Sequence, residues 1–411
     1  GARDLLEAMA ASPEWTGHRF AVLRTAARLL PHGEETASVQ KVRQEAAALE
    51  DLDPGFASLR AKIHGTPEAA DAERVRAFAA RAGAELRPRY EALAAAIDAA
   101  YAPAPVAETL EEVAGTLRGG GGVRERLREE ATRFRQAASD EERLALTAAI
   151  LADLRDAVGQ ARGTADRLRL LDLGLAVEAE HFRLGTTLRP RLASLTRAER
   201  VELLKAGAEA AYGAGLVNSR QRRALAGALD ALVVPELPLA GYHAGLHEAN
   251  RLPGWATQSL RMHFFEPMQK LSEIEPRAHL FVQDQVRGGA LFFYSGVLDG
   301  LMKDADRLAG VERRLFGRSV GAGLNALNPG LDRGILHASP DVGDPSNVRR
   351  DGNYQLPETV SELRPVAGIL TRGAGNPLSH VQLLARNLGI PNVAVDASLV
   401  DALRQHDGQK V

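Results

Sequence analysis

The chain has 411 residues, of which 45% are hydrophobic and 25% charged, with 51 basic against 53 acidic side chains. This composition is that of a folded protein with room for two or three domains. The net charge of −2 provides no general attraction to nucleic acid or to an anionic membrane. The lack of cysteine excludes disulfides, thiolate catalysis and cysteine-ligated zinc.

No apolar run approaches the roughly 18 residues that span a bilayer, and the N-terminus lacks the basic and apolar regions of a secretion signal. We therefore expect a soluble, cytoplasmic protein with neither a membrane nor a nucleic-acid partner.

Residues 1–235 form the first expected domain, which is helical. They are rich in Ala, Leu, Arg and Glu and contain little Ile, Thr or Tyr, so helical hairpins or a bundle are predicted. Ser139 and Glu142 have the spacing of a capping box and predict a helix with an apolar stripe of Leu144, Leu146, Ile150, Leu151 and Leu154. The four glycines 119–122 lack the context of a phosphate-binding loop and predict a flexible turn.

Residues 236–333 are expected to be a second helical domain or a linker region. A proline-rich break at 234–238 marks its start, and helices are predicted from Gly241 to about Leu327. His243 and His247 have helical i, i+4 spacing and could face one metal ion. The order H-x-x-x-H-E, however, lacks the general base of zinc hydrolases, and paired surface histidines are frequent. No metal site is therefore predicted.

Residues 334–411 predict a small α/β domain. Strands are expected at 334–338, 354–356, 366–371 and 392–395, with one helix at about 380–388 and a short one at 398–405. The order strand, helix, strand favours a βαβ unit whose reactive loop follows the carboxyl end of a strand.

The helix predicted at 380–388 begins at a histidine. Ser379 is the expected N-cap, and Gln382, three residues later, could reach back to it. Gly389 fits a left-handed C-terminal cap, and Pro391 prevents the helix from continuing. Free N–H groups at the start of this helix would stabilise an anion carried by His380.

The run Leu378 to Val393, LSHVQLLARNLGIPNV, resembles the phosphohistidine element of phosphoenolpyruvate-utilizing enzymes: phosphoenolpyruvate synthase, pyruvate phosphate dikinase and the alpha-glucan water dikinases. Most of these enzymes place threonine two residues before the histidine, whereas this chain has Leu378 after an additional Asn376 and Pro377. The glucan dikinases are more similar in this respect. The resemblance is specific over about 30 residues and looser over the last 130 or so, where 287–336 resembles the region ahead of the swivelling domain.

The resemblance implies that His380 is transiently phosphorylated on a swivelling α/β domain. Neutral imidazole is a good nucleophile near pH 7, so this role fits its chemistry. Ser379, Thr371 and Arg372 are the candidate phosphate-binding residues, although Ser379 reads first as a cap and Arg372 reads equally as a solvated loop charge. Arg386 lies on another face of the predicted helix and is expected to anchor it or to contact a docking partner.

The chain contains no P-loop, and its helical half offers no strand-rich region for the ATP-grasp domain by which the resembled family binds ATP and Mg²⁺. No cofactor is therefore expected in this chain. The resemblance implies an ATP-grasp domain and an acceptor-substrate domain elsewhere in the same longer protein. Gly1 is not an initiator methionine, and residues 407–411 read as a strand that stops early. We therefore expect a fragment whose swivelling domain is truncated at the C-terminus and which is inactive alone.

The function expected from the sequence is that of a dikinase-like phosphotransferase. His380 would accept a phosphoryl group from ATP and pass it to an acceptor, which could be pyruvate, another small molecule or a glucan. The alternative is a non-catalytic helical scaffold or regulatory module that retains the swivelling fold for docking. The acceptor, the role of the N-terminal helices and the oligomeric state do not follow from the sequence.

Overall fold

The structure is a computed structural model that describes residues 1–30, 39–65, 68–118, 121–320, 323–338, 348–357, 363–372, 378 and 380–411. It divides into two units, one of residues 1–237 and 244–298, the other of residues 238–243 and 299–411. The boundaries between the units lie between residues 237 and 238, inside α14 (Leu239–Ala249) and inside α17 (Leu291–Leu308). Within the described ranges, no helix is both long and apolar enough to cross a membrane.

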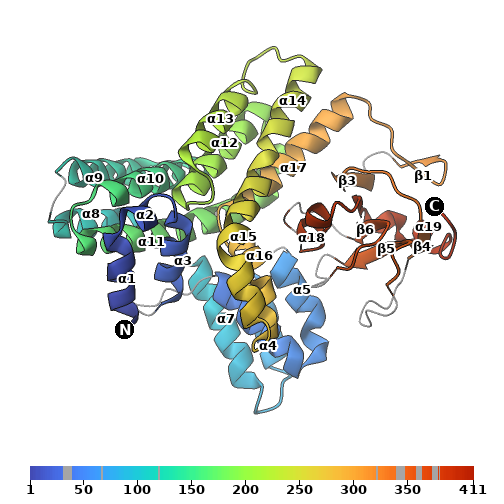
Figure 1. Cartoon of the computed structure of the whole chain (residues 1–411), viewed down its shortest axis with the longest axis horizontal. Helices are drawn as coiled ribbons and strands as arrows, with labels where there is room; N and C mark the ends of the chain where they lie inside the picture. Colours follow the sequence, from blue (N-terminus) through green and yellow to red (C-terminus); the bar gives the residue numbers. More distant parts are fainter. Residues whose placement is uncertain are drawn as a thin grey trace. The chain divides into compact units, whose positions relative to one another are not determined.

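The larger unit, called here the helical unit, is built from helices alone in its described part (Figure 1). Besides the parts of α14 and α17 that belong to it, its helices are α1 (Ala2–Ala11), α2 (Pro13–Thr16), α3 (Phe20–Leu29), α4 (Val39–Leu52), α5 (Ala57–Gly65), α6 (Asp71–Ala79), α7 (Arg87–Tyr101), α8 (Val106–Thr116), α9 (Gly121–Gln136), α10 (Asp140–Gln160), α11 (Thr164–Leu188), α12 (Arg197–Gly213), α13 (Ser219–Asp230), α15 (Arg251–Leu271) and α16 (Phe281–Arg287).

Helix α10 packs against α11 and α12 and begins where the sequence predicted. The Ser139 hydroxyl accepts a hydrogen bond from the Glu142 N–H at 3.2 Å. The Glu142 carboxylate accepts from the Ala138 N–H at 2.7 Å, one residue before the partner that a capping box requires. Four residues of the predicted stripe are buried, and Leu146 is half-buried. The local pattern therefore identified the core-facing side of this helix.

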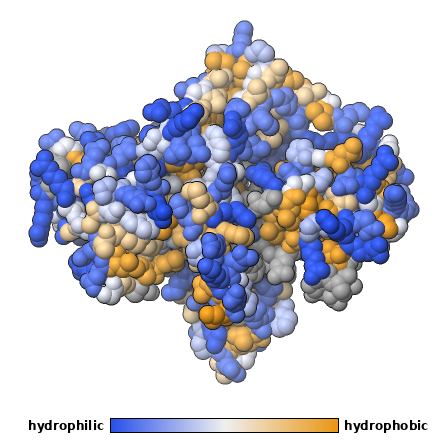
Figure 2. Space-filling model, in the orientation of Figure 1, coloured by the Kyte–Doolittle hydropathy of each residue, from blue (hydrophilic) through white to orange (hydrophobic). Residues whose placement is uncertain are grey.

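Helix α9 is amphipathic, and its outer side, at the left of Figure 2, is mainly hydrophilic. It begins at Gly121, so two residues of the glycine run predicted as a turn are helical, while Gly119 and Gly120 lie outside the described residues. On its inner side, Glu130 is buried next to the Asp153 carboxylate of α10. Burial, reinforced by Asp153, raises the pKa of Glu130 to about 8.

Glu130→Gln is expected to flatten the pH dependence of stability between about pH 4.5 and 8. Folded Glu130 holds a proton up to about pH 8, whereas an unfolded glutamate ionises near its ordinary value of 4.5. The stability that Glu130 contributes is therefore fully present below pH 4.5 and is lost as the pH rises from there through 8. At about 1.4 kcal/mol per pKa unit, the loss amounts to a few kcal/mol. Urea unfolding between about pH 7 and 8 measures the last part of this loss, and an unchanged slope in the variant would contradict the prediction.

That pH range avoids a second buried group. Burial lowers the pKa of His181 to about 4, and its Nδ1 lies 3.0 Å from the Thr147 hydroxyl. Stability linked to His181 is present above its ordinary value of 6.5 and is lost as the pH falls through 4. Above about pH 7, this imidazole is neutral whether the chain is folded or not, so the slope there reports on Glu130.

The smaller unit, called here the sheet unit, contains a five-stranded sheet of order β3-β7-β6-β5-β4 in its described part (Figure 1). Strands β4 to β7 are parallel, and β3 is antiparallel to β7. The elements are β1 (Arg314–Leu315), β2 (Arg318–Ser319), β3 (Leu324–Asn328), β4 (Ile335–His337), β5 (Gly352–Pro357), β6 (Gly368–Arg372), α18 (His380–Leu388), β7 (Asn392–Val395) and α19 (Val400–Arg404).

The structure confirms the four predicted strands as β4 to β7, within a few residues at each end. The short helix expected at 398–405 is present as a 3-10 turn, Ala397–Leu399, followed by α19. A mostly helical chain with a small mixed sheet near its C-terminus is therefore the observed fold class.

The prediction that helices continue to about Leu327 is wrong. Helix α17 ends at Leu308, and Gly310, with φ +61°, turns the chain out of the helix. The next residues form the β1–β2 hairpin, and β3 follows and pairs with β7. Leu and Ala favour helix locally, but pairing with β7, more than 60 positions away in the sequence, overrides that preference.

Candidate functional site

The candidate site lies at the carboxyl end of β6. The chain leaves this strand after Arg372, enters α18 at His380, and returns through β7, which is parallel to β6. This is the βαβ unit expected from the sequence, and α18 has the predicted bounds. Gly389 follows with φ +68°, which confirms the left-handed C-terminal cap. Residues 373–377 and Ser379 lie outside the described residues, as does the His380 side chain.

One face of α18 packs on the sheet. Val381 and Ala385 are fully buried against Tyr354, Leu356 and Ile369, in a cluster that Val366 and Ile390 complete. Leu384 of the same helix is half-buried, and Leu388 at its end is exposed. Leu378, which stands where the resembled family has threonine, is fully buried. A large apolar residue thus fixes the chain just before the helix.

A buried chain of hydrogen bonds positions α18 on the sheet. The Thr371 hydroxyl donates to Asn392 Oδ1 at 2.7 Å, and Asn392 Nδ2 donates to Gln382 Oε1 at 2.7 Å. Gln382 Nε2 then donates to the Leu327 carbonyl oxygen at 2.6 Å. The three side chains are completely buried, so each bond satisfies a group that would otherwise lose its water. This network links β6, β7, α18 and β3.

Two of these residues have partners that the sequence did not suggest. The sequence did not indicate that the Gln382 amide contacts β3 and β7. Its predicted bond to Ser379 stays a prediction, because Ser379 lies outside the described residues. Thr371 was predicted to bind phosphate, but its only hydroxyl hydrogen is donated to Asn392. In this arrangement Thr371 has no hydrogen to offer a phosphoryl oxygen, and the proposed role in phosphate binding stays a prediction.

Arg372, the second predicted phosphate ligand, is the last residue of β6 and is exposed. Successive side chains of a strand point to opposite faces, so Arg372 leaves the sheet on the side away from Thr371 and α18. The structure therefore brings Thr371, but not Arg372, to the face that α18 covers. The third candidate ligand, Ser379, lies outside the described residues.

Arg386 is a partly buried cation on α18. It is half-buried, and burial lowers the pKa of its guanidinium. No acidic residue of the described ranges forms an ion pair with it. The two roles expected for it, anchoring the helix to neighbouring structure or contacting a docking partner, stay predictions.

Sequence reasoning did not single out His337, which ends β4 at the same carboxyl edge of the sheet. Its ring stacks on that of Tyr354, with centroids 4.5 Å apart and planes inclined by 11°. The Tyr354 hydroxyl accepts a hydrogen bond from the Arg349 N–H at 2.7 Å, which fixes the ring beneath the histidine. The only signal in the sequence is a histidine at the end of a short predicted strand.

Among the described residues, no third metal ligand accompanies the histidine pair of α14. His247 is exposed, and the neighbouring Glu248 forms an ion pair with Arg251 at 2.9 Å. Over the described part of the chain, no group of three or more His, Asp or Glu side chains is arranged to hold a metal ion.

Comparison with known proteins found no matching family model, no similar curated protein and no similar solved structure.

Proposed function

We propose that this chain carries phosphoryl groups in a dikinase-like phosphotransferase, with His380 as the residue that is transiently phosphorylated. One observation carries the proposal: His380 is the first residue of α18, directly after the loop that follows the carboxyl end of β6. In open parallel sheets, ligands bind at this edge of the strands. The likeness of residues 378–393 to the phosphohistidine element supports the same residue from the sequence.

The start of α18 favours a phosphoryl group electrostatically. The helix has nine residues, and its first N–H groups have no partner within the helix. They point along the axis toward the N-terminus, where the helix dipole also contributes a partial positive charge. A phosphoryl group on residue 380 would thus meet hydrogen-bond donors and favourable charge. The buried Thr371, Asn392 and Gln382 chain holds this helix end in place without requiring any motion during transfer.

The proposed chemistry divides the reaction between a donor step and an acceptor step. In the first, the unprotonated imidazole nitrogen attacks the β-phosphorus of ATP, a P–N bond forms, and the P–O bond to AMP breaks with its electron pair going to the leaving oxygen. The γ-phosphoryl group then passes to water or inorganic phosphate, which leaves one phosphoryl group, the former β-phosphate, on the ring. The other ring nitrogen then releases its proton. In the second transfer the acceptor oxygen attacks phosphorus and the P–N bond breaks with its electron pair going to the ring nitrogen. The ring takes up a proton, from the acceptor hydroxyl or from water, and the neutral imidazole is restored. Dividing the reaction in this way allows donor and acceptor sites to be separate.

The proposal assigns ATP and Mg²⁺ to an ATP-grasp domain of the same longer protein, and pyruvate, a glucan or another acceptor to a further domain. Such a division needs the phosphorylated domain to move between sites, which is the swivelling role in this proposal. Accordingly, calorimetric titration of this chain with ATP and Mg²⁺ is expected to show weak binding or none. Micromolar affinity would overturn the assignment.

The test supplies ATP radiolabelled at the β-phosphate to the full-length protein and to its His380→Ala variant. Label is expected on the wild-type protein, labile in acid and stable in base, as phosphohistidine is, and absent from the variant. Equal labelling of both proteins would exclude His380 as the carrier. A wild-type protein that takes up no label would favour the scaffold alternative. Circular dichroism shows whether the variant is folded.

A further inference from the structure

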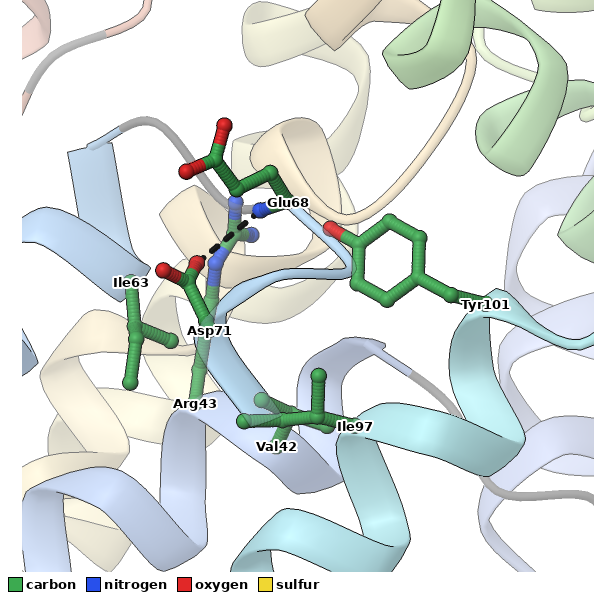
Figure 3. A pocket seen from close by; sticks show the side chains of 7 residues that line it. All are labelled: Val42, Arg43, Ile63, Glu68, Asp71, Ile97 and Tyr101. Carbon is green, nitrogen blue, oxygen red and sulfur yellow. Dashed lines mark hydrogen bonds between the residues drawn. The ribbon is translucent and has the colours of Figure 1, made fainter. Parts of the chain in front are cut away.

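The pocket drawn in Figure 3 belongs to the packing of the helical unit. It is lined by side chains of α4, α5, α6 and α7, together with Glu68, and it has no room for a water molecule. The Glu68 N–H donates to the Asp71 carboxylate at 2.9 Å, and Lys62 Nζ lies 2.5 Å from the same carboxylate. The charge of Asp284 opposes that of Arg43. These polar groups therefore serve one another, and no ligand fits between them.

Helix α15, yellow in Figure 1, carries large apolar side chains on the side away from its buried residues. The buried residues of this helix are Leu252, Pro253, Ala256, Thr257 and Leu260. At about 3.6 residues per turn, five other residues share the opposite side of the helix. This set, called here the seam, consists of Trp255, Gln258, Met262, Phe265 and Gln269. Met262 is 75% exposed and Phe265 is 45% exposed. An exposed apolar patch with polar neighbours is typical of a protein–protein interface.

The seam has the spacing of a coiled coil. Its residues follow one another in steps of three, four, three and four positions, as the a and d positions of two heptads do. The residues that a coiled coil leaves on its outer side are those by which α15 packs on its own unit, such as Ala256 and Leu260. One side of α15 therefore belongs to the core of the unit, and the other side has the pattern that pairs with a second helix.

The charges on the two flanks of the seam are complementary. Arg261 directly precedes Met262, in heptad position g, and Glu266 directly follows Phe265, in heptad position e. In a parallel pair, each g residue lies next to the e residue five positions further on in the other helix, so Arg261 meets Glu266 of a second copy. In an antiparallel pair, g residues lie next to g residues, and Arg261 meets its own counterpart. Glu266 also pairs with Lys270 at 3.1 Å within its chain, and a carboxylate can accept from both cations. The charges thus favour a second copy of the same helix in parallel orientation.

We propose that α15 is a dimer contact, in which it pairs in parallel with α15 of a second copy around a two-fold axis. Each seam residue then meets its own counterpart, as in an isologous contact. Met262 and Phe265 form the apolar centre, and methionine and aromatic residues are enriched in such centres. The amides of Gln258 and Gln269 bond to their counterparts, because an amide both donates and accepts. This contact is independent of the function proposed for His380.

Cysteine cross-linking of the whole chain tests the parallel register. The chain has no cysteine, so Met262→Cys introduces a single thiol. In the proposed pair, the two Cα atoms at position 262 are about 6 Å apart, within the range that a disulfide bridges. Oxidised glutathione is expected to convert Met262→Cys into a covalent dimer on a non-reducing gel. Ile274→Cys is the matched control and is expected to cross-link much more slowly. Ile274 is 85% exposed just after the same helix but lies off the seam.

Analytical ultracentrifugation measures the pairing without a cross-link. The wild-type chain is expected to sediment as a dimer. Met262→Glu places two like charges in the apolar centre and is expected to raise the dissociation constant by about tenfold or more. Arg261→Glu is expected to weaken the dimer as well, and adding Glu266→Arg to it is expected to restore the dimer, because the ion pair is then only reversed. Ile274→Glu is expected to behave as wild type.

Four results would overturn the contact. They are a wild-type chain that is monomeric at every concentration, a Met262→Glu variant that dimerises like wild type, equal cross-linking at positions 262 and 274, and a double variant no tighter than Arg261→Glu. A dimer that dissociates in Ile274→Glu but not in Met262→Glu would place the contact on another surface. If circular dichroism shows that Met262→Glu does not fold, the cross-linking comparison decides instead.

Discussion

Gln382→Met is expected to release α18 from the sheet. Methionine fills nearly the same volume but leaves Asn392 Nδ2 and the Leu327 carbonyl oxygen buried without partners. Each such group costs about 1–3 kcal/mol, so the sheet unit should lose roughly 2–6 kcal/mol of stability. Thr371→Val leaves only Asn392 Oδ1 without its donor and should cost roughly 1–3 kcal/mol.

Hydrogen exchange read by mass spectrometry measures this locally, which matters because a chain of two units need not unfold in one step. Peptides from α18 and β7 should exchange faster in Gln382→Met, to a smaller extent in Thr371→Val, and peptides from α10 should be unchanged. Gln405→Met, at an exposed position of the same unit, is the matched control and should leave all rates as in wild type. Full protection of α18 in Gln382→Met would show that the network does not hold the helix.

Gly213→Ala is expected to strongly destabilise the helical unit. A Cβ atom at this position of α12 would lie 2.6 Å from the Leu151 carbonyl oxygen and 2.5 Å from Leu151 Cβ. The oxygen belongs to the backbone of α10, so no side-chain rotation relieves the clash. The two helices would have to move apart, at a cost of about 3 kcal/mol or more.

Gly227→Ala makes the same chemical change but is expected to raise the stability of the chain. This glycine lies inside α13, where an added Cβ would meet no atom within 4 Å. Replacing it should stabilise the chain by about 0.5–1 kcal/mol, because alanine loses less backbone entropy in a helix. Thermal unfolding followed by circular dichroism compares the pair. Shifts of the same sign in both variants would contradict the close packing of α10 and α12.

Local signals sufficed for the elements that surround the site. The bounds of α18 followed from the residues at its two ends, and its Gly389 cap is present as expected. Strands β4 to β7 are short apolar segments between turn residues, which is a pattern visible in the sequence. These features depend on neighbours within a few positions, and so the sequence alone predicts them.

The features that escaped prediction depend on distant partners. The residues of β3 have a local sequence that favours a helix, and they form a strand because they pair with β7. Asn392 looked like the start of a strand, but it also joins Thr371 to Gln382, which no spacing along the chain indicates.

The most direct test of the role proposed for His380 locates the phosphoryl group on the protein. The whole chain is incubated with phosphoramidate, a small donor that phosphorylates histidines, and the modified residue is identified by tandem mass spectrometry among the 11 histidines present. His380 is expected to carry the phosphoryl group in large excess over the exposed His247, and His380→Asn is expected to lose it. Modification spread evenly over exposed histidines, or concentrated at a residue other than His380, would contradict the proposal.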